Sequence, residues 1–270
     1  MDLSTTVTLN NGIKIPILGF GTWQITGETC EKAVLNALKL GYRHIDTARI
    51  YNNEKEVGRA IKKSKIPREE IFVTTKLWNT DHDNIEGALE ASLKKLGTGY
   101  VDLYLMHYPV KEVRNRSWMA MEKLLDHGMT KSIGVSNFTI RHLKELIEKT
   151  KSVPSVNQVE FNPYLCQKEL LEFCRKNKIQ LEAYCPLVRG RKMNDPRLIE
   201  IAEKYNKTQS QILIRWGVQH EVVAIPKATS EEHIKENADV FDFEISPGDM
   251  KILNSFNEDF RVCWDPTGEP

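Results

Sequence analysis

The strongest constraint on the fold of this chain is a regular alternation of short apolar runs with amphipathic stripes. Eight runs have the length of a strand and are rich in Val, Ile, Leu and Tyr. Most of them lack polar alternation, which is typical of strands buried on both faces of a parallel sheet. The predicted strands are Ile17–Phe20, Arg43–Asp46, Ile71–Lys76, Val101–His107, Ser132–Ser136, Val156–Glu160, Gln180–Tyr184 and Val222–Ile225.

Helical patterns lie between these runs. Apolar residues recur with i, i+3, i+4 spacing, and glycine follows several of the stripes as a stop signal. Asp195 before Pro196 predicts a capped helix start, and Thr208 with Gln211 predicts a capping box. The stripes lie in Cys30–Leu38, Ile85–Leu96, Trp118–Leu125, Ile140–Ile147, Leu198–Tyr205 and Ile212–Trp216.

Repeated strand–helix units predict an α/β protein built as a (β/α)₈ barrel, the TIM barrel, for which about 250 residues is a common size. No linker divides the chain, so we expect one domain over residues 1–270. An open, doubly wound sheet is the structural alternative. Val7–Leu9 and Lys14–Pro16 flank a turn containing Gly12 and predict an N-terminal β-hairpin that caps one end of the barrel.

Composition excludes several classes of protein. With 40% hydrophobic and 28% charged residues the chain is globular, and its net charge of +1 predicts no nucleic-acid or membrane partner. The five cysteines contain no C-x-x-C pair, which favours a reducing, cytoplasmic location. No apolar signal core or membrane-length run is present. The seven histidines show no ligand spacing, so no metal is expected.

Polar side chains end successive predicted strands. Active sites of such barrels lie at the carboxyl ends of the strands, so these side chains should converge at one mouth. The residues in question are Asp46, Lys76, His107, Ser136, Asn137, Gln158, Glu160, Tyr184 and Lys227.

Asp46, Tyr51 and Lys76 form the most informative set. An ammonium among apolar walls needs a counter-charge, and Asp46 is the nearest candidate for Lys76. A phenol beside an ammonium is expected to have a pKa below its usual value of about 10, so Tyr51 could donate a proton near neutral pH. A structural ion pair and a buried core histidine at His107 are the alternatives. The dinucleotide fingerprint G-x-G-x-x-G is absent because Gln24 interrupts it.

Several motifs together resemble those of the aldo-keto reductases. The segment His44–Glu54, followed by Gly58, resembles the D-T-A-x-x-Y-x-N-E…G signature. Lys76–Asn79 resembles the K-x-W motif. The other matches are Gly134–Phe138, Asn157–Glu160 and Ile225–Lys227, and the resemblance extends from about Val7 to Phe260.

This resemblance implies a nicotinamide-dependent reductase of aldehydes and ketones, with a small carbonyl compound as substrate. The reductions of aldose sugars, of methylglyoxal and of diketo-gluconate are the three alternatives that it leaves open. Tyr51 would be the general acid, Lys76 paired with Asp46 would tune it, and His107 would orient the carbonyl. The implied substrate-pocket residues are Trp23, Tyr51, Trp78, His107 and Tyr108. The chain ends soon after Trp264, which implies an open pocket.

The resemblance also implies a cofactor site. Ser136, Asn137 and Gln158 would hold the nicotinamide carboxamide, and Tyr184 would stack on its ring. Lys227 would meet the adenosine phosphate. The remaining implied cofactor residues are Gly21, Thr22, Trp23, Asp46, Cys185, Leu187, Ala228, Thr229, His233, Glu236 and Asn237.

Some positions depart from the family pattern. Ala228 and His233 replace a serine and an arginine that contact the 2′-phosphate, but Lys227 remains, so the expected cofactor is NADPH, with NADH as a second candidate. Cys185 replaces a common serine and is interpreted as a packing residue. Arg189, Arg191 and Lys192 are interpreted as a solvated loop.

Two other functions remain open from the sequence. One is a catalytically idle protein that binds nicotinamide, and the other is a barrel aldolase that uses Lys76 as a Schiff-base nucleophile. Whatever the function, we expect the protein to be a monomer or a weak oligomer.

Overall fold

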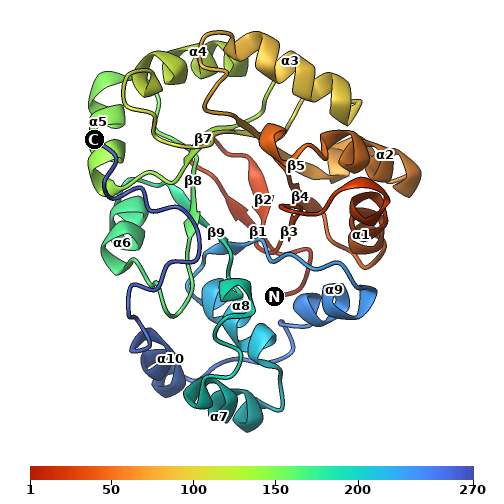
Figure 1. The fold of residues 1–270 in the computed structure, drawn as a ribbon, viewed down its shortest axis with the longest axis vertical. Helices are drawn as coiled ribbons and strands as arrows, with labels where there is room; N and C mark the ends of the chain where they lie inside the picture. The colour runs from red at the N-terminus through yellow and green to blue at the C-terminus, as the bar shows by residue number, and fades with distance from the viewer.

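Eight parallel strands, hydrogen-bonded in chain order, form the central sheet of the computed structural model, which describes residues 1–270 (Figure 1). The register between neighbours is parallel throughout. The strands are β3 Phe20–Gly21, β4 His44–Asp46, β5 Phe72–Leu77, β6 Leu103–Met106, β7 Ile133–Ser136, β8 Val156–Glu160, β9 Gln180–Tyr184 and β10 Val223–Ala224.

Backbone contacts between the first and last segments close this sheet into a barrel. Leu18 and Ala224 form a parallel bridge, and the amide of Gly19 donates to the Ala224 carbonyl at 2.8 Å. A Cβ on Gly21 would lie 2.8 Å from the carbonyl oxygen of Ile225, so glycine permits the close approach. The (β/α)₈ barrel is therefore confirmed over the doubly wound alternative. The first strand, expected at Ile17–Phe20, is shorter and lies later, because Leu18 takes part only in the closing bridge.

Helices surround the strands (Figure 1). The predicted caps are present, because the Asp195 side chain accepts from the Arg197 amide and Thr208 forms its capping box with Gln211. The helices are α1 Gly27–Lys39, α2 Glu54–Ser64, α3 Ile85–Leu96, α4 Arg114–Asp126, α5 Ile140–Lys149, α6 Lys168–Lys176, α7 Pro196–Tyr205, α8 Gln209–Gln219, α9 Glu231–Ala238 and α10 Pro247–Asn254, with short 3₁₀ turns η1 Arg49–Tyr51, η2 Arg68–Glu70 and η3 Val188–Gly190.

The expected N-terminal hairpin is formed by β1 Thr6–Thr8 and β2 Lys14–Pro16, which pair antiparallel. Gly12 has a φ of +86°, the left-handed conformation that such a tight turn favours. Asn10 donates to the Pro154 carbonyl at 3.1 Å, just before β8 begins. The hairpin therefore covers the amino-terminal end of the barrel.

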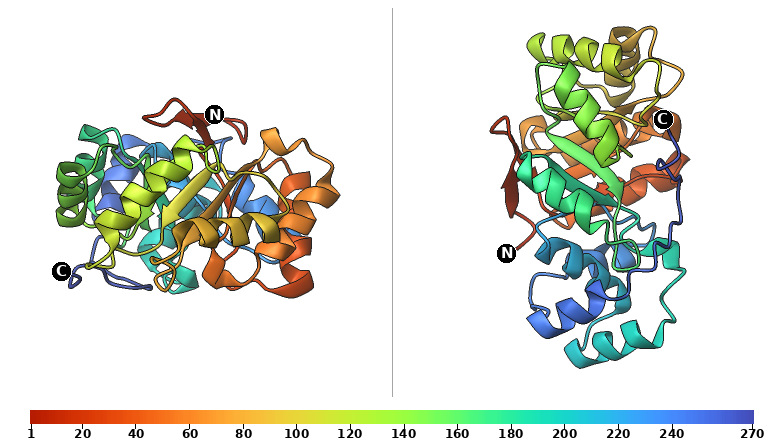
Figure 2. Two further views of the ribbon diagram at one scale, coloured as in Figure 1. Left: turned by 90° about the horizontal axis from the view of Figure 1, so that it is seen from above. Right: turned by 90° about the vertical axis from the view of Figure 1, so that its left-hand side faces the viewer.

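Residues 255–270 follow α10 without further helix or strand and lie on the face opposite the hairpin (Figure 2). We call them the C-terminal segment. Its end is held on α5, where Nε2 of His142 lies 2.9 Å from the Glu269 carbonyl. This segment therefore passes over the carboxyl ends of the strands, where the candidate active-site residues lie.

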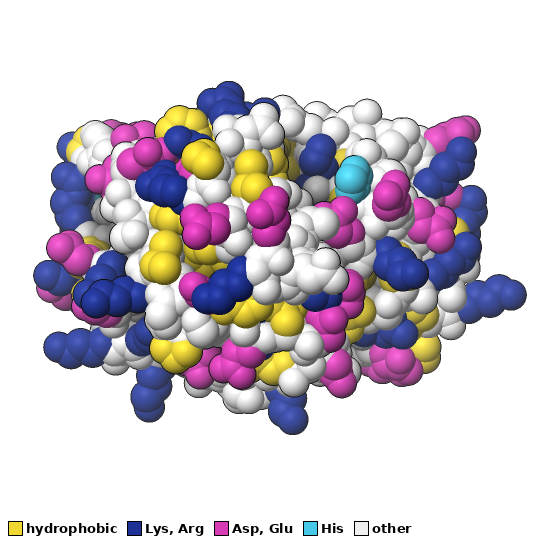
Figure 3. All heavy atoms as spheres, turned by 90° about the horizontal axis from the view of Figure 1, so that it is seen from below, with side chains coloured by type: hydrophobic (Ala, Val, Ile, Leu, Met, Phe, Trp, Pro, Cys, Tyr) yellow, Lys and Arg dark blue, Asp and Glu magenta, His cyan; other side chains and the backbone are white.

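The face of the molecule drawn in Figure 3 carries interspersed charges of both signs, which agrees with a net charge of +1. None of the helices combines the length and the hydrophobicity needed to cross a bilayer.

Candidate active site

A buried ion pair lies at the carboxyl ends of β4 and β5. Nζ of Lys76 lies 2.7 Å from both carboxylate oxygens of Asp46 and 2.9 Å from the carbonyl oxygen of Thr47. It also donates to the hydroxyl oxygen of Tyr51 at 3.3 Å. The Lys76 side chain is fully buried, so this pairing is what compensates for the loss of water around its charge.

The loop that carries Tyr51 is held by the signature residues on either side of it. Asn53 donates from its side-chain amide to the carbonyls of Thr22 and Ile25, at 2.9 and 2.8 Å. The Thr47 hydroxyl donates to the Asn53 side chain at 2.6 Å. The Thr75 hydroxyl donates to Glu54 at 2.7 Å and joins the following helix to β5. These bonds fix η1, and with it the direction of the Tyr51 side chain.

The pKa of Tyr51 corrects the expectation from sequence. Burial raises the pKa well above 10, and the nearby Asp46 carboxylate raises it further. The predicted lowering by Lys76 does not appear, because Asp46 neutralises that ammonium at 2.7 Å. Tyr51 therefore keeps its proton at neutral pH.

His107 follows β6 and packs against Tyr51 and Trp78, with ring centroids 5.8 and 5.2 Å away. Burial lowers its pKa well below 6.5, and the positive charge of Lys76 acts in the same direction. The imidazole is therefore neutral at physiological pH. Its Nδ1 is buried without a hydrogen-bond partner, which leaves Nε2 as the ring nitrogen available to a ligand.

Side-chain amides and one phenol form the wall beside Asp46. Gln158 donates to Oδ2 of Asp46 at 2.8 Å, and the Ser136 hydroxyl donates to the Gln158 carbonyl at 2.9 Å. The Tyr184 hydroxyl donates to Oδ1 of Asn137 at 2.7 Å. Asn137 has a left-handed φ of 64°, a conformation that asparagine tolerates. The ends of β7, β8 and β9 are thus joined into one hydrogen-bonded surface.

A cavity of about 730 Å³ opens over these groups. Twelve of the residues proposed from sequence line it, which are Gly21, Trp23, Asp46, Tyr51, His107, Ser136, Asn137, Gln158, Tyr184, Cys185, Leu187 and Lys227. The volume lies in the range typical of small-molecule and cofactor sites.

The other proposed residues lie around or beyond the cavity. Thr22 is buried beneath it and donates to the Asp46 carbonyl at 2.9 Å, and Lys76 lies under Tyr51. Trp78 and Tyr108 instead contact Trp264. Five further proposed cofactor residues follow Lys227 in the chain, in the loop before α9 and in α9 itself, and do not line the cavity. They are Ala228, Thr229, His233, Glu236 and Asn237.

Sequence reasoning missed the contribution of the C-terminal segment. Trp264 packs 5.8 Å from Trp78 and 5.7 Å from His107, between ring centroids, and forms part of the cavity wall. The segment is held because the Glu160 carboxylate accepts from the amides of Val262 and Cys263, at 2.9 and 3.0 Å. Trp264 therefore narrows the pocket. The sequence led us to expect an open pocket, without a contribution from this side chain. No local pattern signals a contact this distant in sequence.

Arg189 is a second such residue. It is exposed, as expected of its loop, yet it also lines the cavity, and its guanidinium carbon lies 4.9 Å from the centre of the Trp23 ring. The cavity lining thus joins amides and aromatic rings with the two cations Arg189 and Lys227. Amide partners, an aromatic face and cations are the groups that a nicotinamide dinucleotide, with its carboxamide ring and phosphates, requires. The lining fits such a cofactor.

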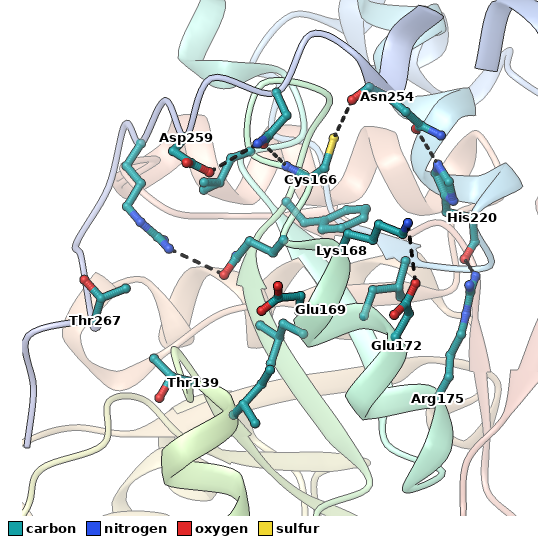
Figure 4. A pocket seen from close by; sticks show the side chains of 18 of the residues that line it. Thr139, Cys166, Lys168, Glu169, Glu172, Arg175, His220, Asn254, Asp259 and Thr267 are labelled. Atoms are coloured by element: carbon teal, nitrogen blue, oxygen red, sulfur yellow. Dashed lines mark hydrogen bonds and ion pairs between the residues drawn. The ribbon is translucent and has the colours of Figure 1, made fainter. Parts of the chain in front are cut away.

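A wider hollow of about 1380 Å³ lies outside the barrel along α6 (Figure 4). Its rim mixes opposite charges, such as Lys168 and Glu172, 3.9 Å apart. None of Asp46, Tyr51, Lys76 or His107 reaches it. The barrel cavity is therefore the candidate active site.

Comparison with known proteins agrees with this geometry. Residues 17–258 match the model of the aldo/keto reductase family. The chain belongs to this family, whose members generally use nicotinamide cofactors.

Three relatives illustrate the similarity. The chain is 46% identical to glyoxal reductase of Bacillus subtilis, over 98% of this chain and 97% of that protein. It is 42% identical to methylglyoxal reductase DkgA of Escherichia coli, over 97% of each. A crystal structure of an aldo-keto reductase enzyme from a Medee basin deep-sea metagenome library matches with a TM-score of 0.93 and 47% identity, covering 97% of this chain and 98% of that one. Family and relatives together support carbonyl reduction.

Proposed function

We propose that this protein reduces small aldehydes and ketones to alcohols with NADPH, and that Tyr51 is the general acid. The observation that carries the proposal is the Tyr51 hydroxyl, protonated at neutral pH and held 3.3 Å from Nζ of Lys76 in the cavity. Two of the relatives are named for the reduction of glyoxal and of methylglyoxal. We therefore propose that the substrates are 2-oxoaldehydes about as small as glyoxal and methylglyoxal, which would fit a pocket narrowed by Trp264.

The proton chemistry follows from the site. Reduced nicotinamide, when bound, supplies the hydride to the carbonyl carbon. Negative charge then develops on the carbonyl oxygen, and Tyr51 donates its proton there. The phenolate left behind is stabilised by the ammonium of Lys76. Because this stabilisation grows as the proton leaves, it acts on the transition state more than on the ground state.

His107 would supply a second hydrogen bond. An unpaired buried N–H costs more than an unpaired ring nitrogen, so the orphaned Nδ1 of His107 favours the tautomer that carries its proton on Nε2. A neutral imidazole with that proton donates to the carbonyl oxygen and orients it.

The cofactor would lie along the amide wall. Asn137, Gln158 and Ser136 would hold its carboxamide, Tyr184 would pack on the ring, and Lys227 would meet the phosphate. The site draws on segments from Gly21 to Trp264, so we propose that residues 1–270 act as one domain.

The five cysteines of the protein are all free thiols, which fits the reducing, cytoplasmic location that we propose.

The aldolase alternative is disfavoured by the same geometry. A Schiff-base lysine needs a free amine, whereas Lys76 is bonded to both Asp46 oxygens and to Thr47. Borohydride trapping of a carbonyl compound on Lys76 would support the aldolase instead.

The decisive test compares the wild type with Tyr51→Phe on glyoxal, methylglyoxal and larger aldehydes. We expect oxidation of NADPH by the wild type, and a loss of kcat of about 10²–10⁴-fold in the variant. Cofactor binding, followed by quenching of protein fluorescence, should persist in both. Binding without turnover in the wild type would favour the catalytically idle alternative.

A further inference from the structure

Two cysteine thiols meet at the rim of the cavity. Sγ of Cys185, after β9, lies 3.4 Å from Sγ of Cys263 in the C-terminal segment, although 78 positions separate them. Both residues line the cavity. Of the five cysteines, these are the only two in sulfur–sulfur contact; Cys30 and Cys174 are buried apart, and the Cys166 thiol contacts the Pro163 carbonyl.

The surroundings of the pair favour a thiolate on Cys263. The contact with Cys185 lowers the pKa of Cys263 and raises that of Cys185, so the pair has one acidic and one protonated member. Burial and the Glu160 carboxylate oppose this lowering, whereas the cations Arg189 and Arg191 add to it, and the net shift of the Cys263 pKa is downward. Burial, by contrast, raises the pKa values of Cys30, Cys166 and Cys174 to about 12. A thiolate is the form that reacts with oxidants.

The loop that begins at Cys185 is conformationally strained. Cys185, Val188 and Arg189 all have positive φ, at 48°, 52° and 53°. For a β-branched residue such as Val188 this conformation is a clear outlier. Backbone strain of this kind clusters at ligand clamps and switch regions of proteins. On the other chain segment of the pair, the amide of Cys263 donates to the Glu160 carboxylate at 3.0 Å. A bond between the two sulfurs would therefore tie a strained loop to a docked segment.

We propose that Cys185 and Cys263 form a peroxide-sensitive dithiol whose disulfide ties the loop after β9 to the C-terminal segment and slows ligand passage through the cavity. Formation of the disulfide does not depend on whether the protein is a reductase. Its effect on cofactor passage rests on the function proposed above.

The chemistry requires hydrogen peroxide as oxidant. The Cys263 thiolate attacks one peroxide oxygen, the O–O bond breaks, and the released hydroxide takes a proton to become water. The Cys185 sulfur then attacks the sulfenic acid and loses its proton. The S–S bond forms as the S–O bond breaks, and a second water leaves. The two sulfurs lose two electrons, which the peroxide gains. The sulfurs must approach by only about 1.4 Å to reach disulfide length.

Peptide mapping tests the disulfide. Reduced protein is treated with hydrogen peroxide, its free thiols are alkylated, and it is digested with trypsin. We expect a cross-linked pair of the peptides Ile179–Arg189 and Val262–Pro270, two hydrogens lighter than their sum, that dithiothreitol separates. Oxidation confined to other cysteines, or separate sulfinic acids without the cross-link, would overturn the proposal.

Binding kinetics test the consequence. For Cys185→Ser and for Cys263→Ser, the rate of NADPH binding is measured before and after peroxide treatment. Cys166→Ser is the matched control, because it removes a thiol that is not part of the pair. In wild type and Cys166→Ser, oxidation should slow NADPH binding about tenfold, as expected when the open population falls by that factor. Dithiothreitol should restore the rate, and neither pair variant should respond. A mapped cross-link with unchanged binding would refute the locking role. Absence of binding in the reduced wild type would instead contradict the proposed function, while the cross-link result would stand.

Discussion

The hydroxyl oxygen of Tyr51 lies 3.3 Å from Nζ of Lys76, an ammonium that Asp46 already neutralises through two contacts of 2.7 Å. Tyr51 is thus attached to a buried pair of low net charge rather than to an isolated cation. Burial of the phenol, together with this arrangement, explains why Tyr51 keeps its proton in the folded protein. The buried pair is also a point at which a single substitution should destabilise the fold.

Breaking the pair on one side should destabilise the fold. In Lys76→Met the Asp46 carboxylate stays buried without its partner, and we expect the free energy of unfolding to fall by about 3–5 kcal/mol. The double variant Asp46→Asn/Lys76→Met should recover part of that loss, because no charge is left unpaired. Urea denaturation followed by circular dichroism measures both. Lys168→Met, which removes an exposed amine 3.9 Å from Glu172, serves as the control and should change stability by less than about 1 kcal/mol. A similarly small change in Lys76→Met would contradict the prediction.

The pH dependence of reduction should lack a histidine step. Burial and Lys76 depress the pKa of His107, so its imidazole is still neutral as the pH falls through 6.5. In the proposed mechanism the protonated form of Tyr51 is the active one, and its raised pKa means that this form is lost only above pH 10. We therefore expect a flat profile of kcat/KM between these two values. An alkaline loss of activity starting well below pH 10 would show that the pKa of Tyr51 is lowered in the working enzyme.

Lys227 should govern the proposed preference for NADPH over NADH. It is exposed at the cavity, where its ammonium can form a charge-assisted bond with a phosphate. Such bonds contribute about 1.5–3 kcal/mol, so Lys227→Met should raise the Kd for NADPH roughly 10- to 100-fold. NADH binding should change much less. Lys235→Met on α9 removes a nearby exposed charge outside the cavity and controls for the general field. Equal weakening of both cofactors would count against a phosphate contact.

Glu160 should hold the C-terminal segment in place. In Glu160→Gln one of the two oxygens that accept from Val262 and Cys263 becomes an NH₂ group, which faces a donor. The loss of about 1–3 kcal/mol should raise the undocked population at least about fivefold. Trypsin cleavage after Arg261 reports this population through release of Val262–Pro270. The exposed Glu169→Gln on α6 is the matched control, and equal cleavage of both variants would show that Glu160 does not anchor the segment.

The sequence predicted the barrel because its signals are local. The expected bounds of Val156–Glu160 and Gln180–Tyr184 match β8 and β9, and the caps at Asp195 and Thr208 form as expected. Prediction was weakest at Ile17–Phe20 and Val222–Ile225, where the barrel closes. Pairing at this closure joins two segments that are far apart in the chain, and each paired stretch is short. Local sequence patterns therefore define the ends of these strands poorly.

The sequence by itself determined the alternation of strands and helices, the polar residues at the strand ends and the motifs that resemble one enzyme family. Each of these is carried by neighbouring residues, whose spacing specifies backbone periodicity and the direction of a side chain. Only the tertiary structure decided that Asp46 cancels the charge of Lys76 and leaves the pKa of Tyr51 raised. It also decided that Trp264 enters the cavity wall and that Cys263 meets Cys185. Burial, net local charge and contacts between distant segments arise from the packing of the whole chain, and no short stretch of sequence contains them.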